Sequence, residues 1–175
     1  VTDAFEAGWD GVKLYFMIGL PTETDADILG IAELARKVSR RFYEIPKEKR
    51  GKGLRLSVSA SSFVPKPFTP FQWAAQDSLD EIRRKQALLR EALKIRGVTF
   101  NWHDPETSFL EACFARGDRR MAHVLFRAYE LGCRLDGWNE HCIYAAWLQA
   151  FADTGVDPAF YSIRVSGKQE LLPWE

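Results

Sequence analysis

Residues 12–24 read VKLYFMIGLPTET, an apolar run that ends at a glycine and a proline. The run over Val12–Gly19 is too short for a helix, so it predicts a buried strand, and Pro21 ends it. Thr24, followed three residues later by Asp27, is typical of the capping box that starts a helix. The helix that follows should bury one apolar stripe against a sheet, formed by Ile28, Ile31, Ala35, Val38 and Phe42.

A second unit of strand, loop and helix follows the first. Residues 54–64 alternate apolar and polar side chains, which predicts a strand with two different faces. The three prolines within residues 64–71 lack amide donors, so this segment should leave the strand as an extended loop. Ser78 and Glu81 resemble a second capping box, before a helix that Gly97 ends. Two successive units of this kind predict parallel strands joined by crossover helices.

Both strands are asymmetric. The first places Lys13, Tyr15 and Met17 on one face and only apolar residues on the other, and the second places serines opposite its apolar face. In a barrel with outer helices, the apolar faces would pack outward and the mixed faces would line a lumen with room for a ligand. Ligands of such folds bind at the carboxyl ends of the strands, here residues 17–21 and 61–67.

The composition changes after a short predicted strand over residues 98–102. Helices are expected to open at Asp104, Asp118 and Asn139. We therefore predict an α/β part over residues 1–100 and a helical extension over residues 101–175. The chain opens without an initiator methionine, which suggests a piece of a longer protein.

The overall charge excludes a general attraction to nucleic acid, because 24 basic residues balance 24 acidic ones in the 175-residue chain. Locally, the stretch Arg36–Arg55 holds nine Lys or Arg against two Glu. Two interpretations stay open: a solvated helix end and loop, or a surface for RNA or an acidic protein.

Three cysteines, Cys113, Cys133 and Cys142, have no CxxC spacing and predict buried, reduced thiols. The chain has no histidine or carboxylate pattern of a metal site, no apolar run of about 18 residues and no signal peptide. We expect a cytoplasmic protein that does not enter membranes.

Two motifs resemble those of radical S-adenosylmethionine (radical SAM) enzymes. Residues 15–24, YFMIGLPTET, are similar to the fifth strand of that family, with its Gly-x-Pro-x-Glu-Thr turn. Residues 56–59, continuing to FVPKPFTP at residues 63–70, are similar to the sixth. The segment from Phe71 through residues 100–106 and the tail resembles uncharacterised members that carry an N-terminal cobalamin-binding domain. The resemblance implies the C-terminal part of a (β/α)6 partial TIM-type barrel, followed by an all-helical extension.

The resemblance also implies cofactors and sites. Intact members bind S-adenosylmethionine and a 4Fe-4S cluster held by a CxxxCxxC loop, which this sequence lacks, so the fragment alone should be inactive. By the resemblance, Met17, Ile18 and Gly19 should lie against the SAM adenosine, and the Phe63, Val64 and Pro65 backbone near the adenine edge.

Tyr15, Ser59 and Ser61 are the expected substrate-side residues, whereas Glu23 is interpreted as a helix-start residue stabilised by the helix dipole. The implied reaction is reductive SAM cleavage with radical chemistry, or group transfer assisted by cobalamin, on an unidentified substrate. The expected partner is the upstream part of the same polypeptide. The alternative function is a non-catalytic binding module that uses Arg36–Arg55.

Overall fold

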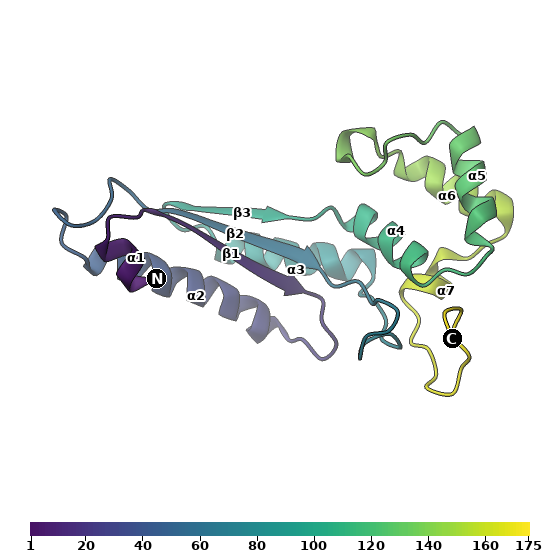
Figure 1. Cartoon of the computed structure of the whole chain (residues 1–175), viewed down its shortest axis with the longest axis horizontal. Helices are drawn as coiled ribbons and strands as arrows, with labels where there is room; N and C mark the ends of the chain where they lie inside the picture. The colour runs from purple at the N-terminus through teal and green to yellow at the C-terminus, as the bar shows by residue number, and fades with distance from the viewer. The chain divides into compact units, whose positions relative to one another are not determined.

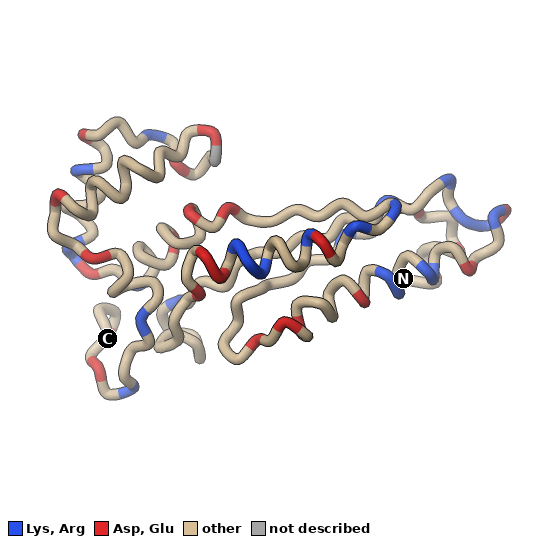
Figure 2. The backbone as a smooth tube through the Cα atoms, turned by 180° about the vertical axis from the view of Figure 1, so that it is seen from behind, with Lys and Arg blue, Asp and Glu red and all other residues tan. Residues whose placement is uncertain are grey.

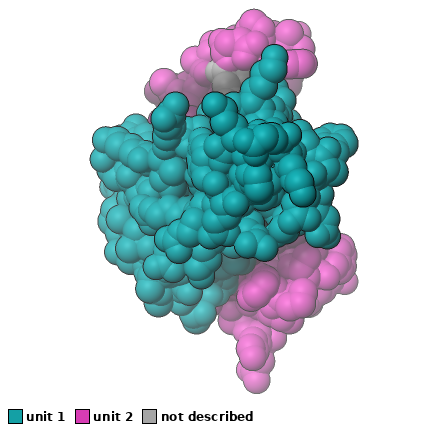
Figure 3. Space-filling view, turned by 90° about the vertical axis from the view of Figure 1, so that its left-hand side faces the viewer, with its two compact units in different colours: residues 1–62, 80–103 teal, residues 63–79, 104–175 magenta. Residues whose placement is uncertain are grey.

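The computed structural model describes the backbone of the whole chain and the side chains of residues 1–138 and 140–175. The chain forms two compact units (Figure 3). The first contains residues 1–62 and 80–103, and the second contains residues 63–79 and 104–175. The loop that follows the second strand therefore clusters with the later helices.

A parallel sheet forms the framework of the first unit (Figure 1). Its strands are β1 (Gly11–Ile18), β2 (Arg55–Ser62) and β3 (Val98–Trp102), in the order β1-β2-β3. The pairing places Tyr15 beside Ser59, and Ser59 beside Asn101. The sequence correctly predicts an α/β fold with parallel strands. The sheet is open and not closed into a barrel, because among the described strands β1 and β3 each pair on one side only.

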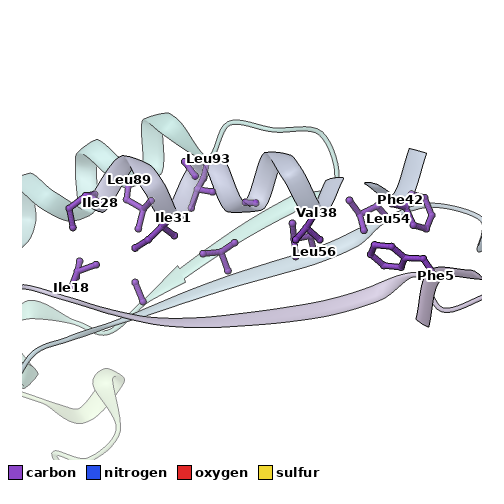
Figure 4. Close-up of a cluster of buried hydrophobic side chains, with 14 of the residues drawn as sticks. Phe5, Ile18, Ile28, Ile31, Val38, Phe42, Leu54, Leu56, Leu89 and Leu93 are labelled. Atoms are coloured by element: carbon purple, nitrogen blue, oxygen red, sulfur yellow. The ribbon is translucent and has the colours of Figure 1, made fainter. Parts of the chain in front are cut away.

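Helices α2 (Asp25–Glu44) and α3 (Leu79–Ala92) cover one face of this sheet (Figure 4). The predicted capping box is confirmed, because Asp27 Oδ2 accepts the Thr24 amide at 2.8 Å and Thr24 Oγ1 accepts the Asp27 amide at 3.4 Å. The predicted stripe of α2 is buried, and Ile28 and Ile31 lie between the helices and the strands (Figure 4). The short helix α1 (Thr2–Glu6) adds Phe5, which packs edge-on against Phe42 at 5.2 Å between ring centroids.

The second unit contains α4 (Pro105–Ala115), α5 (Met121–Glu130), α6 (Tyr144–Thr154), α7 (Pro158–Ser162) and the 3-10 helix η1 (Asn139–His141). Its core gathers side chains from the four α-helices, among them Leu110, Val124, Phe151 and Tyr161. No described helix combines the length and the apolar character that crossing a bilayer requires.

The predicted starts of these helices are correct for one of three. Asp104 caps α4 and accepts the Thr107 amide at 2.8 Å. Helix α5 begins two residues later than a cap at Asp118 predicts, because Asp118 accepts the Arg120 amide and forms a turn before the helix. Helix α6 begins at Tyr144, after a separate 3-10 turn, and the predicted capping side chain of Asn139 lies outside the described side chains.

Candidate functional site

The uncovered face of the sheet brings together four of the predicted site residues. Tyr15 and Met17 project from β1 and are 73% and 47% exposed. In the parallel register, Tyr15 lies beside Ser59 and Met17 lies beside Ser61. Ser61 Oγ donates to the Phe16 carbonyl at 3.3 Å, which holds that hydroxyl against β1. An apolar thioether and three hydroxyl groups therefore share one accessible surface, which we call the open face.

The other two predicted cofactor residues of β1 have different surroundings. Ile18 is 1% exposed and belongs to the core under the helices, on the face opposite Met17. Gly19 has a φ of +85°, which favours glycine, and its amide donates to Glu23 Oε2 at 2.7 Å. Of these three residues, only Met17 presents its side chain to the open face, and the Gly19 N–H is already satisfied.

Glu23 connects the turn after β1 with helix α3. Its carboxylate lies 3.0 Å from Lys85 Nζ, and the two side chains are 7% and 5% exposed. A buried charge needs a partner and hydrogen bonds, and here Lys85 and the Gly19 amide supply them. Glu23 directly precedes the cap residue of α2, as its interpretation as a helix-start residue expects, and its carboxylate also binds back to the turn and to another helix.

Phe63, Val64 and Pro65 belong to the second unit. The side chains of Phe63 and Pro65 are buried and that of Val64 is half-buried, and the Phe63 ring packs edge-on against Phe71 at 5.7 Å. The Phe63 carbonyl accepts a hydrogen bond from Gln76 Nε2 at 3.1 Å, and the same amide donates to the Ser108 carbonyl at 3.0 Å. The side chains of Phe63 and Pro65 are thus packing groups, and the backbone of this segment is held by a buried amide.

Arg116, which directly follows α4, also holds this loop. Its guanidinium donates to the Ala74 carbonyl at 2.9 Å and to Ser166 Oγ at 2.7 Å. Burial lowers the pKa of Arg116, which is 4% exposed. The sequence analysis did not identify Gln76 or Arg116, because their partners are main-chain carbonyls that no side-chain pattern reveals. Together they join the loop of residues 63–79 to α4 and to the C-terminal segment.

Asn101 of β3 is a further residue of the open face that the sequence analysis did not identify. It lies beside Ser59 in the register, and its Nδ2 donates to Ser57 Oγ at 3.1 Å. The sequence does carry a signal for Asn101, because Thr99 and Asn101 alternate with apolar residues along β3, which predicts that both lie on one face of the strand. The open face therefore continues over all three strands as a row of hydroxyl and amide groups.

The cysteines of this chain do not fit an iron-sulfur cluster. Cys113 is completely buried, and burial raises the pKa of its thiol to about 12. Burial also raises the pKa of Cys133 and of Cys142. A cluster needs thiolates, which these environments disfavour. Among the side chains described, no group of three or more His, Cys, Asp or Glu is arranged to hold a metal ion.

The basic stretch Arg36–Arg55 covers the C-terminal half of α2 and the loop before β2 (Figure 2). Four of its arginines have partners within the first unit. Arg36 donates to the Ala92 carbonyl and Arg50 to the Tyr43 carbonyl. Arg41 forms an ion pair with Glu44, and Arg55 forms one with Asp10. The cations without a side-chain partner among the described residues are Lys37, Arg40, Lys47, Lys49 and Lys52.

Comparison with known proteins found one similar curated protein, named uncharacterized protein MJ0966, from Methanocaldococcus jannaschii. The two sequences are 27% identical over 149 residues, which is 85% of this chain and 31% of that protein. The chain thus spans about a third of the length of this relative. No protein-family model matches the chain, and no solved structure matches it.

Proposed function

We propose that this chain is the C-terminal portion of a radical SAM enzyme, with β1 and β2 as the fifth and sixth strands of its partial barrel and β3 as a further strand paired to β2. The open face is the observation that carries the proposal. Parallel sheets are normally covered on both faces, yet here one face is uncovered and the eight-residue strand β1 has a free edge among the described residues. Further strands paired to β1 would complete the wall of a barrel and enclose the open face.

The match to a longer relative supports the same proposal. The aligned 149 residues are 31% of that protein, so a relative of this chain continues well beyond the matched part. The cluster motif would lie in such an additional part, because Cys113, Cys133 and Cys142 do not fit the cluster. Cobalamin would be bound by an upstream domain. We place the enzyme in the cytoplasm, where cysteines that form no disulfide stay reduced.

Met17 fits a contact with the SAM adenosine, since it is a half-exposed apolar group at the carboxyl end of β1. Ile18 and Gly19 would contact the adenosine through their main chain only. The resemblance assigns the backbone of residues 63–65 to the adenine edge. Tyr15, Ser59 and Ser61 would orient the substrate by hydroxyl hydrogen bonds. SAM, when bound at a reduced cluster, supplies the radical chemistry of this family. In the proposed site, this chain provides walls and hydrogen bonds.

The test is SAM cleavage by the intact parent protein, reconstituted with iron and sulfide under anaerobic conditions. We expect formation of 5′-deoxyadenosine, a KM for SAM that Met17→Ala raises several-fold, and no effect of Lys37→Ala on the exposed side of α2. The 175-residue chain alone should not cleave SAM. A parent that binds no iron, or that holds a cluster and leaves SAM intact, would contradict the proposal.

The alternative function is a binding module for RNA or an acidic protein. The observation that favours it is a set of five cations in Arg36–Arg55 that have no side-chain partner among the described residues, because clustered cations concentrate positive potential on a neutral chain. Its signature is binding by the isolated chain that weakens steeply with salt. Lys47→Gln combined with Lys49→Gln should then reduce the affinity and the salt dependence.

A further inference from the structure

A hollow of the first unit lies between helix α3 and the edge strand β3. It has a volume of about 240 Å³ and is lined by Arg83, Gln86, Ala87, Arg90 and Trp102. Trp102 pairs in register with Ala60, which is buried on the helix-covered side of β2. The hollow is therefore separate from the open face, which carries the alternate residues of the strands.

Trp102 is a fixed and accessible aromatic ring. It is 43% exposed, and its ring lies 5.1 Å from that of Phe100 with an interplanar angle of 32°. Gln86, which is 6% exposed, donates from Nε2 to the carbonyl of the next residue, His103, at 2.9 Å. The Phe100 ring packs against the indole, and the hydrogen bond holds the backbone that follows Trp102, while part of the indole surface faces solvent.

Two arginines of α3 accompany this ring. Arg83 and Arg90 are seven residues apart, about two helical turns, so they project from the same side of α3. Arg90 has no side-chain partner among the described residues. The Asp80 carboxylate lies 3.7 Å from Arg83 and is 97% exposed. The described side chains that line the hollow include two guanidinium groups and no carboxylate.

We propose that this hollow binds a nucleotide, with the base stacked on Trp102 and the phosphate held by Arg90 and Arg83. Any nucleobase can stack on an indole, because every base has a flat aromatic face. A guanidinium can donate two parallel hydrogen bonds to phosphate oxygens. The stretch Arg36–Arg55 lacks such an aromatic partner for a base, and the hollow supplies one. The ligand is either a free nucleotide or one unit of a single-stranded nucleic acid, since both present the same base and phosphate.

The test is a titration of the 15N-labelled 175-residue chain, followed by NMR, with AMP, with hexaadenylate RNA and with inorganic phosphate. We expect saturable shifts of the Trp102 indole N–H and of the α3 amides near Arg90. Trp102→Leu and Arg90→Gln should each weaken binding by about fivefold or more, whereas Trp102→Phe keeps a stacking ring and most of the affinity.

Arg119→Gln is the matched control, because Arg119 is exposed, has no side-chain partner among the described residues and lies outside the hollow, the open face and the basic stretch. It removes the same charge and should leave binding unchanged. Arg90 is also exposed, so Arg90→Gln should fold normally and keeps the test decisive even if Trp102→Leu does not fold. Saturable binding of AMP that needs Trp102 and Arg90 supports a free nucleotide, and binding of hexaadenylate alone supports a single strand.

Three results would overturn the inference. The first is the absence of saturable binding by AMP and hexaadenylate. The second is phosphate binding as tight as that of AMP with no effect of Trp102→Leu, which would mean that no base is stacked. The third is binding that is lost in Arg40→Gln or in Met17→Ala instead, which would place the ligand on the basic stretch or on the open face. None of these results depends on whether the parent protein cleaves SAM.

Discussion

Lys85 Nζ lies 3.0 Å from Glu23 Oε2, and neither side chain is more than 7% exposed. The same carboxylate oxygen accepts the Gly19 amide at 2.7 Å. The turn at the carboxyl end of β1 is thus held by a positive charge from α3, a helix that lies about 60 residues further along the sequence. This contact holds the backbone of the turn that follows β1, the strand that carries Met17 on the open face.

Removal of Lys85 should strongly destabilise the first unit. Lys85→Met leaves the Glu23 carboxylate buried without its cation, and breaking a buried pair in this way costs about 3–5 kcal/mol. Urea unfolding followed by circular dichroism should show this loss. The double variant Glu23→Gln with Lys85→Met removes both charges and should recover part of the stability.

Lys94→Met is the matched control for that experiment. Lys94 pairs with Glu91 at the end of α3, where the two side chains are 68% and 60% exposed. Exposed pairs contribute about 0–1 kcal/mol, so this variant should unfold near the wild-type midpoint. Equal effects of Lys85→Met and Lys94→Met would show that the pair with Glu23 is not buried.

The two sides of β1 should respond differently to truncation. Ile18→Ala opens a cavity in the core under the helices and should cost about 2–5 kcal/mol in unfolding free energy. Met17→Ala, one residue away on the open face, should stay within about 0.5 kcal/mol of the wild type. A large loss of stability in the isolated chain on Met17→Ala would mean that the open face is covered.

The strands and helices of the first unit were largely predictable, because their signals are local. The capping box of Thr24 and the stripe of α2 depend on spacings of three and four residues. Lys85 was not predictable as a buried residue, since a lysine in a helix normally faces solvent and its partner lies on a distant turn. Likewise, the hollow beside Trp102 joins a helix and a strand whose pairing appears only in the folded sheet.

The second unit was less predictable for a related reason. Asp118 has the residue type of a helix cap, but its carboxylate binds the Arg120 amide and the Tyr161 hydroxyl, so the helix starts later. Gln76 and Arg116 act on carbonyl groups of distant loops. For the open face, alternation along the strands placed Tyr15 and the serines on the mixed faces of their strands, and the register shows that Tyr15 and Ser59 lie side by side.

Gln76 should be required for the order of the loop that carries Phe63. Gln76→Ala leaves the carbonyls of Phe63 and Ser108 without this buried donor and should cost about 1–3 kcal/mol. Hydrogen exchange should quicken within residues 63–79. Gln149→Ala is the control, because its exposed amide donates only to Asp153 among the described side chains, and it should change little. Unchanged exchange in Gln76→Ala would contradict the assigned contacts.

The cysteines should react with a thiol reagent in an order set by burial. Cys113 is fully buried with a pKa of about 12, so at pH 8 it should react far more slowly than the half-buried Cys142. Mass spectrometry after timed alkylation, with Cys142→Ser as the control, measures this order. Because the unfolded Cys113 thiol ionises at a lower pH than the folded one, stability should fall as the pH rises above the ordinary thiol pKa. Rapid labelling of Cys113 in the folded chain would contradict its burial.

The most direct test of the proposed radical SAM assignment is to read the coding DNA upstream of Val1. We predict an open reading frame that continues for about four further strand-helix units of roughly 30 residues each and contains a CxxxCxxC motif near the start of that stretch. The free edge of β1 would then have its partner strand. A start codon directly before Val1, or an upstream frame without this motif, would contradict the assignment.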